Sequence, residues 1–214
     1  MRKELSDITV IADRSGSMSV CRDEAENGIN HFIDDQKKQS GEATFSLVHF
    51  DTEYEFAHRA VPIQTVPHYT LVPRGMTALL DAVGRAINET GNRLSEIAEA
   101  DRPGLVVFVI VTDGQENSSH EFTKAQIKGM IDRQQRDYAW QFTFLGANQD
   151  AFAEAHALGI VGATAQVDIH NINLAYKSAS NNVTRMRHAS TAGMTVSNAY
   201  TADELKNMSD TNAK

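Results

Sequence analysis

An apolar run leads directly into a polar turn in the stretch Ile8-Thr9-Val10-Ile11-Ala12-Asp13-Arg14-Ser15-Gly16-Ser17. Its first half is rich in β-branched residues and predicts a strand. One carboxylate and two hydroxyls follow at every second position, on Asp13, Ser15 and Ser17. Hard oxygen ligands at the carboxyl end of a strand favour a divalent cation such as Mg²⁺ or Mn²⁺. A strand-to-helix turn in which Ser15 or Ser17 caps the next helix explains these five residues equally well.

The composition is that of a globular protein with one substantial core. The chain has 214 residues, of which 41% are hydrophobic and 22% charged, and its formal net charge is −8. No long basic run is present, so we expect no nucleic-acid partner, and the acidic surface would repel anionic membranes. Cys21 is the only cysteine, which excludes a disulfide within the chain. Because the N-terminus also lacks the apolar core of a signal peptide, we expect a cytoplasmic protein.

Strand patterns alternate with helical patterns along the chain. This alternation predicts an α/β fold with a doubly wound, mostly parallel sheet and helices on both faces. Only a short turn separates residues 43–50 from residues 54–63, so these two strands must be antiparallel, with the second one at an edge. The predicted strands are 8–13, 43–50, 54–63, 105–111, 140–145 and 165–170, and the predicted helices are 22–38, 77–99, 123–138, 150–158 and 172–186.

The composition changes near residue 190, where Ser, Thr, Asn and Ala become dominant. We therefore expect a domain over residues 1–190 and a flexible tail over residues 191–214. A capping pattern at Thr201-Ala202-Asp203-Glu204 predicts one short helix within that tail.

The run Leu105-Val106-Val107-Phe108-Val109-Ile110-Val111 is unbroken and apolar, as in a central strand that is buried on both faces. Asp113 follows it at a distance of two residues. Sites in open α/β sheets lie beyond the carboxyl ends of the strands, at the point where the strand order reverses. If both strands are central, Asp13 and Asp113 end neighbouring strands at the same edge.

Three stretches follow one another along the chain: Asp13-Arg14-Ser15-Gly16-Ser17-Met18, Gly75-Met76-Thr77-Ala78-Leu79 and Val111-Thr112-Asp113-Gly114. Together they resemble the Asp-x-Ser-x-Ser motif, the threonine loop and the strand-end aspartate motif of the von Willebrand factor type A domain family. The resemblance covers roughly residues 6–190. It implies that a metal-ion-dependent adhesion site is built from Asp13, Ser15, Ser17, Thr77 and Asp113.

The resemblance also implies how such a site works. The serines would bind a divalent cation directly, and the aspartates would often act through water. Mg²⁺ is the expected cation, with Mn²⁺ and Ca²⁺ as alternatives. Neutral hydroxyls leave the cation electrophilic, so an Asp or Glu of a partner protein can fill its open position. The implied function is a non-enzymatic, metal-dependent adaptor, similar to the standalone domains of bacteria and phages.

Two other functional classes stay open. The first is a structural or assembly subunit that holds its partner constitutively, with the metal only stiffening the loops. The second is a Mg²⁺-dependent hydrolase, because two aspartates near a cation also suit phosphoryl transfer. Against the hydrolase, no Lys or His recurs beside the three motifs as a general acid or phosphate clamp.

Several residues beside the motifs have two interpretations each. We expect Arg14 to be a solvated turn residue, and the alternative is that it attracts an acidic partner. Met18 and Met76 form either an adaptable apolar rim or ordinary loop packing. The polar loop 116–120 belongs either to a binding face or to a solvated connection. Cys21 is interpreted as a buried structural thiol. Asp168 and His170 are interpreted as structural rather than metal-binding.

Overall fold

The chain folds around a six-stranded sheet with helices on both of its faces. The computed structural model describes residues 1–113, 115–147 and 151–209. The strands are β1 (Arg2–Asp13), β2 (Glu42–Phe50), β3 (Tyr54–Pro62), β4 (Pro103–Thr112), β5 (Gln141–Gly146) and β6 (Thr164–Gln166). The α-helices are α1 (Arg22–Lys37), α2 (Leu79–Ser95), α3 (Lys124–Tyr138), α4 (Ala151–Ala157), α5 (Ile172–Thr191) and α6 (Ala202–Ser209). The 3₁₀ helices are η1 (Gly16–Cys21), η2 (Ile63–Thr65), η3 (Glu99–Asp101) and η4 (Ile169–Asn171).

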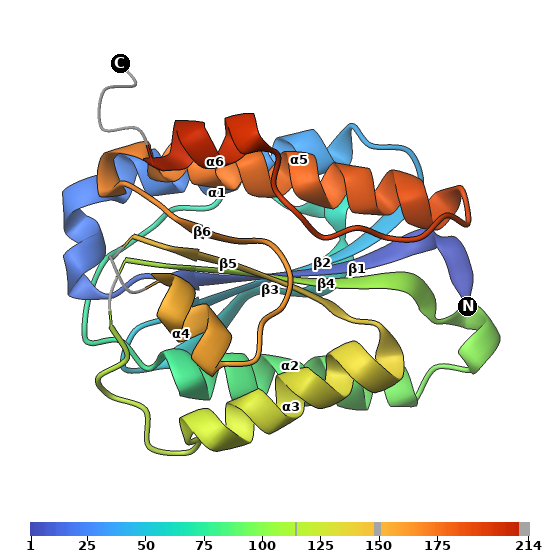
Figure 1. Ribbon diagram of the computed structural model, residues 1–214, viewed down its shortest axis with the longest axis horizontal. Helices are drawn as coiled ribbons and strands as arrows, with labels where there is room; N and C mark the ends of the chain where they lie inside the picture. Colours follow the sequence, from blue (N-terminus) through green and yellow to red (C-terminus); the bar gives the residue numbers. More distant parts are fainter. Residues whose placement is uncertain (114, 148–150, 210–214) are drawn as a thin grey trace.

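The sheet has the strand order β3-β2-β1-β4-β5-β6. Every neighbouring pair is parallel except β2 and β3, whose short connection makes them antiparallel and places Phe50 opposite Tyr54. The predicted doubly wound sheet with one antiparallel edge strand is therefore confirmed (Figure 1).

Two strand boundaries differ from the sequence-based expectation. β1 begins at Arg2 rather than at residue 8, because Arg2 pairs with Pro103 at the start of β4. β6 ends at Gln166 rather than at residue 170, because Asp168 begins a 3₁₀ turn and accepts a hydrogen bond from the backbone N–H of His170 at 2.8 Å. This local role agrees with the structural interpretation of Asp168 and His170.

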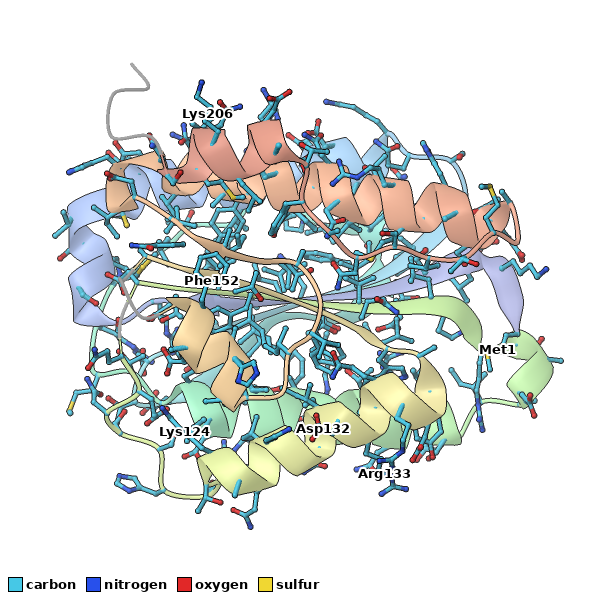
Figure 2. All side chains as sticks on the ribbon, viewed as in Figure 1. Met1, Lys124, Asp132, Arg133, Phe152 and Lys206 are labelled. Carbon is cyan, nitrogen blue, oxygen red and sulfur yellow. The ribbon has the colours of Figure 1, made fainter. Side chains whose placement is uncertain are left out.

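The core lies in two layers, one on each side of the sheet. Alternate side chains of β4, from Leu105 to Val111, pack with residues of α1 and α5, and the side chains between them, from Val106 to Ile110, pack with residues of α2 and α3. Figure 1 shows α1, α5 and α6 on one face of the sheet and α2, α3 and α4 on the other, and Figure 2 shows side chains filling both spaces. Within the described residues, no helix combines the length and the apolar character needed to cross a membrane.

The segment that follows α5 returns across the domain. The side-chain amide of Asn198 donates to the carbonyl oxygen of Phe142 in β5 at 2.9 Å, and its oxygen accepts a hydrogen bond from Asn182 of α5 at 2.7 Å. Met208 of α6 is fully buried, and its carbonyl oxygen accepts the N–H of Asp168 at 3.0 Å. The end of the described chain is thus joined to α5, β5 and the turn after β6.

This arrangement differs from the predicted tail over residues 191–214, whose described part, residues 191–209, packs against the domain. The predicted short helix is α6. Its capping box joins the Thr201 N–H to Glu204 Oε2 at 2.8 Å and the Glu204 N–H to Thr201 Oγ1 at 3.2 Å. The apolar side chains of this segment are few and far apart, so its composition does not reveal that they pack.

Close packing between α1 and α5 depends on Gly28. A Cβ atom at this position would lie 2.6 Å from Cδ2 of the buried Tyr176 ring. We expect Gly28→Ala to lower the free energy of unfolding by about 1–3 kcal/mol, since a buried ring must move to make room. Gly129→Ala in α3 is the matched control, because nothing lies within 4 Å of its Cβ position, and it should be neutral or stabilising by up to about 1 kcal/mol. Urea unfolding followed by circular dichroism measures both, and equal effects would contradict the packing account.

Candidate metal site

The carboxyl ends of β1 and β4 form the centre of the site. These strands are neighbours, and Ala12 pairs with Val111, so Asp13 lies level with Thr112. β1 also pairs with β2 on its other side. The connection after β1 therefore leads to one half of the sheet, and the connection after β4 leads to the other half. Ligand sites of open α/β sheets form at such a switch point.

Hydrogen bonds link four of the five predicted site residues into a chain. Asp13 is 1% exposed; its Oδ1 accepts the N–H of Ser15 at 2.7 Å, and its Oδ2 accepts the hydroxyl of Thr112 at 2.6 Å. The hydroxyl oxygens of Ser15 and Ser17 are 3.0 Å apart, and the Ser17 hydroxyl donates to Oδ1 of Asp113 at 2.9 Å. Residues 96 positions apart in the sequence thus come into direct contact.

Thr77 lies on a separate loop that is joined to the first motif through the backbone. The N–H of Gly16 donates to the carbonyl oxygen of Gly75 at 3.2 Å, which holds the two loops side by side. Gly75 has a φ of 69°, a conformation that glycine adopts without strain. Thr77 is 3% exposed, and its N–H and carbonyl group both bond to Asn117, at 3.0 and 3.1 Å. The predicted threonine is therefore fixed through its backbone.

The site concentrates negative charge. The pKa of Asp13 is raised to about 6, mainly by burial and also by the charge of Asp113, although hydrogen bonds from Thr112 and Ser15 oppose the shift. Burial also raises the pKa of Asp113, against the hydrogen bond from Ser17. Within the described residues, no lysine, arginine or histidine pairs with either carboxylate. A bound cation would relieve this unfavourable charge.

The donor spacing also fits a small divalent cation. Ligands at 2.0–2.1 Å from Mg²⁺ in an octahedron are about 2.9 Å from their neighbours. The oxygen separations of 3.0 Å between Ser15 and Ser17 and 2.9 Å between Ser17 and Asp113 match that edge length. They are also ordinary hydrogen-bond lengths. The described residues hold no group of three or more His, Cys, Asp or Glu at metal-binding distance.

Arg14 has a different role from the one expected, because it is buried and points away from solvent. Only 5% of the residue is exposed. Its guanidinium donates from Nε to Asp51 Oδ2 at 2.7 Å and from Nη1 to Glu55 Oε2 at 2.8 Å. Nη1 also lies 2.8 Å from Nε2 of His49. The interpretation of Arg14 as a solvated turn residue is therefore wrong, since Asp51 in the turn after β2 and Glu55 in β3 supply carboxylates that compensate its burial.

Asp51 connects the loops around the site. Its Oδ2 accepts hydrogen bonds from Arg14 in the first motif and, at 2.8 Å, from Arg74 in the threonine loop. Its carbonyl oxygen accepts the N–H of Ala78 at 2.8 Å, and its Oδ1 accepts the N–H of Glu53 at 2.6 Å. Sequence reasoning missed this residue because it lies in an ordinary turn, outside the three motifs.

The polar loop after Asp113 holds the first turn of α2. Oε2 of Glu116 accepts the N–H of Leu80 at 2.9 Å, and the hydroxyl of Ser119 accepts the N–H of Asp81 at 3.1 Å. In return, the Asp81 carboxylate accepts the N–H of His120 at 2.8 Å. The first N–H groups of a helix lack partners within the helix, and here a distant loop satisfies them. Gly114, the last residue of the third motif, lies outside the described residues.

The residues beside the first motif fall into two groups. Met18 and Cys21 are buried on the inner side of η1, so Met18 belongs to the core and not to a rim, whereas Met76 is 52% exposed. Burial raises the pKa of the Cys21 thiol to about 12, in agreement with a structural role. The two methionines that flank the motifs thus have different roles.

Comparison with known proteins identifies the fold. No protein-family model matches the chain, and no curated protein sequence matches it. A von Willebrand factor type A structure from Catenulispora acidiphila aligns over 84% of this chain and 42% of its own, with 15% identity and a TM-score of 0.63. Manganese-loaded TRAP protein of Plasmodium vivax aligns over 73% of this chain and 63% of its own, with 14% identity and a TM-score of 0.52. Proximal thread matrix protein 1 of the mussel byssus, with a zinc-occupied adhesion motif, aligns over 72% of this chain and 38% of its own, with 18% identity and a TM-score of 0.50.

The fold and the position of the site define a class: the chain has the von Willebrand factor type A fold. It spans about two fifths to two thirds of the length of the three neighbours. At these levels of identity the likeness extends to the fold alone, and the chemistry of the site has to be argued from its own residues.

The ion pairs of Asp51 predict a large effect on stability. Its side chain is 2% exposed and that of Arg14 6%, so Asp51→Asn leaves the buried guanidinium of Arg14 with only the half-exposed Glu55 as a charge partner. We expect the free energy of unfolding to fall by about 3 kcal/mol. Glu53→Gln is the control, because Glu53 contacts Arg74 with a side chain that is 67% exposed and should cost less than about 1 kcal/mol.

The effect of Asp51→Asn on stability should also depend on pH. Hydrogen bonds from Arg74 and Arg14 hold the pKa of Asp51 below its usual value of 3.8, against the effect of burial. The stabilisation is therefore present above pH 3.8 and is lost as the pH falls through the lower pKa of the folded protein. The difference between the wild type and Asp51→Asn in urea unfolding should be constant from neutral pH to about pH 5 and should shrink below pH 3.8. A difference that grows on acidification would contradict this assignment.

Proposed function

We propose that this domain is a metal-dependent protein-binding module that captures an acidic side chain of a partner protein. The observation that carries the proposal is the hydrogen-bonded chain of Ser15, Ser17 and Asp113 beside the buried Asp13, with oxygen spacings that suit a divalent cation. Two carboxylates without a basic partner in the described chain favour a cation, and the hydroxyls leave much of its charge uncompensated.

The residues divide the work between them. Ser15, Ser17 and Thr77 would offer neutral oxygens to the cation, and Asp13 and Asp113 would supply negative charge beside it. The cation would supply an electrophilic centre for a carboxylate from outside. Mg²⁺ is the expected ion, with Mn²⁺ and Ca²⁺ as alternatives. Two neighbours of the same fold support a divalent ion, since one is described as manganese-loaded and the other as having a zinc-occupied motif.

Asp13 has a second function, which is to shape the first motif. Its carboxylate accepts the N–H of Ser15 and the hydroxyl of Thr112, so it fixes the turn that presents Ser15 and Ser17. Because Thr112 ends β4, the same carboxylate aligns the two strands that carry the site. Removal of Asp13 should therefore weaken metal binding through charge and through geometry.

A titration with Mn²⁺, followed by the loss of its free paramagnetic resonance signal, tests the metal site. We expect one bound ion in the wild type and binding at least about tenfold weaker in Ser17→Ala and Asp13→Ala, as losses around metal sites typically produce. Ser95→Ala is the control for loss of an exposed hydroxyl, because Ser95 ends α2 and Thr77 precedes the start of that 17-residue helix. Wild-type affinity in Ser17→Ala and Asp13→Ala would refute the proposed ligand set.

Capture of a partner distinguishes the adaptor from the alternative functions. We expect proteins bound to the immobilised domain in Mg²⁺ to be released by EDTA, and we expect Asp13→Ala to capture none of them. Capture at fixed stoichiometry that survives EDTA would favour a structural or assembly subunit. Mg²⁺-dependent turnover of a generic phosphate ester that is lost in Asp113→Ala would favour the hydrolase.

A further inference from the structure

A cavity of about 500 Å³ lies at the opposite end of the sheet from the candidate metal site. Pro103, which begins β4, lines this cavity, whereas Thr112 at the other end of the same strand bonds to Asp13. The second half of α2 and the last turns of α3 form its walls, and Figure 2 shows Met1 and Arg133 on this side of the molecule. Its volume lies within the range of about 300–1,000 Å³ that is typical of small-molecule sites.

The inner surface of the cavity is apolar and contains the only tryptophan of the chain. Trp140 is 6% exposed, and its indole stacks on the ring of Phe108 at a centroid distance of 5.4 Å, which fixes its orientation. The buried side chains of Ile87 and Leu94 in α2 line the same space. Together these side chains offer a preformed apolar surface against which a flat ring can pack.

Gly91 leaves room beside this indole. It lies inside α2, where glycine is less favourable than alanine. Within the part of the chain that the structure describes, a Cβ atom at this position would meet only Cη2 of Trp140, at 3.9 Å. Its φ is not in the left-handed region either. Neither crowding nor backbone conformation therefore requires a glycine here, and its effect on the structure is to keep the cavity open.

Two arginines give the cavity a positive charge. Arg102 and Arg133 both line it, and neither forms an ion pair with a carboxylate of residues 1–113, 115–147 or 151–209. The carboxylate of Asp137, one turn after Arg133, pairs with Arg136 instead. No Asp or Glu among the described residues lines the cavity, although the net charge of the whole chain is −8. The local charge is thus opposite in sign to that of the protein, and it favours an anion.

The helix ends at the cavity do not cancel this charge. α2 and α3 both end there, and the last carbonyl groups of a helix carry partial negative charge. Nε of Arg102 donates to the carbonyl oxygen of Ile97 at 2.8 Å, and its Nη2 donates to that of Ser95, the last residue of α2, at 3.3 Å. At the end of α3, the N–H of the left-handed Ala139 bonds back to a carbonyl oxygen of the helix. Arg102 therefore compensates the end of α2, which leaves the charge of Arg133 for a ligand.

We propose that this cavity binds a small aromatic carboxylate, with the ring of the ligand packed against Trp140 and its carboxylate beside Arg133. The site is separate from the metal site and does not depend on the proposed function. A planar guanidinium matches the two oxygens of a carboxylate and can bind both of them. Tyr138 also lines the cavity and is 51% exposed, so it offers a second aromatic surface to the ring of the ligand.

A titration with cinnamate, followed by NMR, tests the site, and the neutral cinnamamide is the comparison ligand. Because Trp140 is the single tryptophan, its indole N–H signal identifies itself. Gly91→Leu fills the cavity, and Gly129→Leu is its matched control, since Gly129 is also helical and nothing lies within 4 Å of its Cβ position. Arg133→Gln removes the charge, and Arg136→Gln is its control, because Arg136 lies on the same helix and does not line the cavity. Circular dichroism checks that each variant is folded.

Cinnamate should shift the indole signal to saturation in the wild type, in Gly129→Leu and in Arg136→Gln, and it should leave the signal unmoved in Gly91→Leu. Arg133→Gln should bind cinnamate about tenfold more weakly, the loss expected for a charged hydrogen bond, and should bind cinnamamide as the wild type does. An indole signal that cinnamate does not move in the wild type, or moves equally in Gly91→Leu, would overturn the cavity as a binding site. Equal affinity of the wild type for cinnamate and cinnamamide would overturn the assignment of an anionic ligand.

Discussion

The arrangement of loops at the carboxyl edge of the sheet depends on the carboxylate of Asp51. This group lies between Arg14 and Arg74, which come from the first motif and the threonine loop. Burying one arginine or one aspartate alone would be costly, and burying the pair together with its hydrogen bonds makes the arrangement stable. The proposed metal ligands themselves are small and polar, and they have little hydrophobic contact to hold them. Their positions therefore depend on the ion pairs of Asp51 with Arg14 and Arg74, which hold the loops that carry them.

The residues that hold the loops are therefore different from the residues that would bind a ligand. The oxygens of Ser15, Ser17 and Asp113 stay available to a ligand, because Asp51 and its arginines fix the loops without using those oxygens. The loop 115–122 acts in the same way on the other side, where Glu116 and Ser119 hold the first turn of α2. A binding site on loops needs such support, since loops have few contacts of their own.

Much of this architecture could be predicted from the sequence, since it depends on patterns that repeat over many residues. The unbroken apolar run of β4, the short turn before β3 and the helical spacing of α1 predict the layers, the central place of β4 and the antiparallel edge pair. The site residues could be proposed because three motifs fall at strand ends and loops. The partners of Arg14 could not be predicted, since its contacts with Asp51 and Glu55 depend on how a turn folds back, and no local pattern encodes that. The packing of residues 191–209 was missed for a related reason: Asn198 and Met208 act singly, through contacts with distant strands.

The pairing of β1 with β4 also determines when the site can form during synthesis of the chain. Asp13 bonds to Thr112, which is made 99 residues later. At a synthesis rate of about 5–20 residues per second, Thr112 is made roughly 5–20 s after Asp13. During that interval the Asp13–Ser17 turn has no neighbour on its β4 side and no defined cavity. Metal binding at the proposed site would therefore have to wait until β4 has docked beside β1, and a loaded site would mark a chain in which these two central strands are paired.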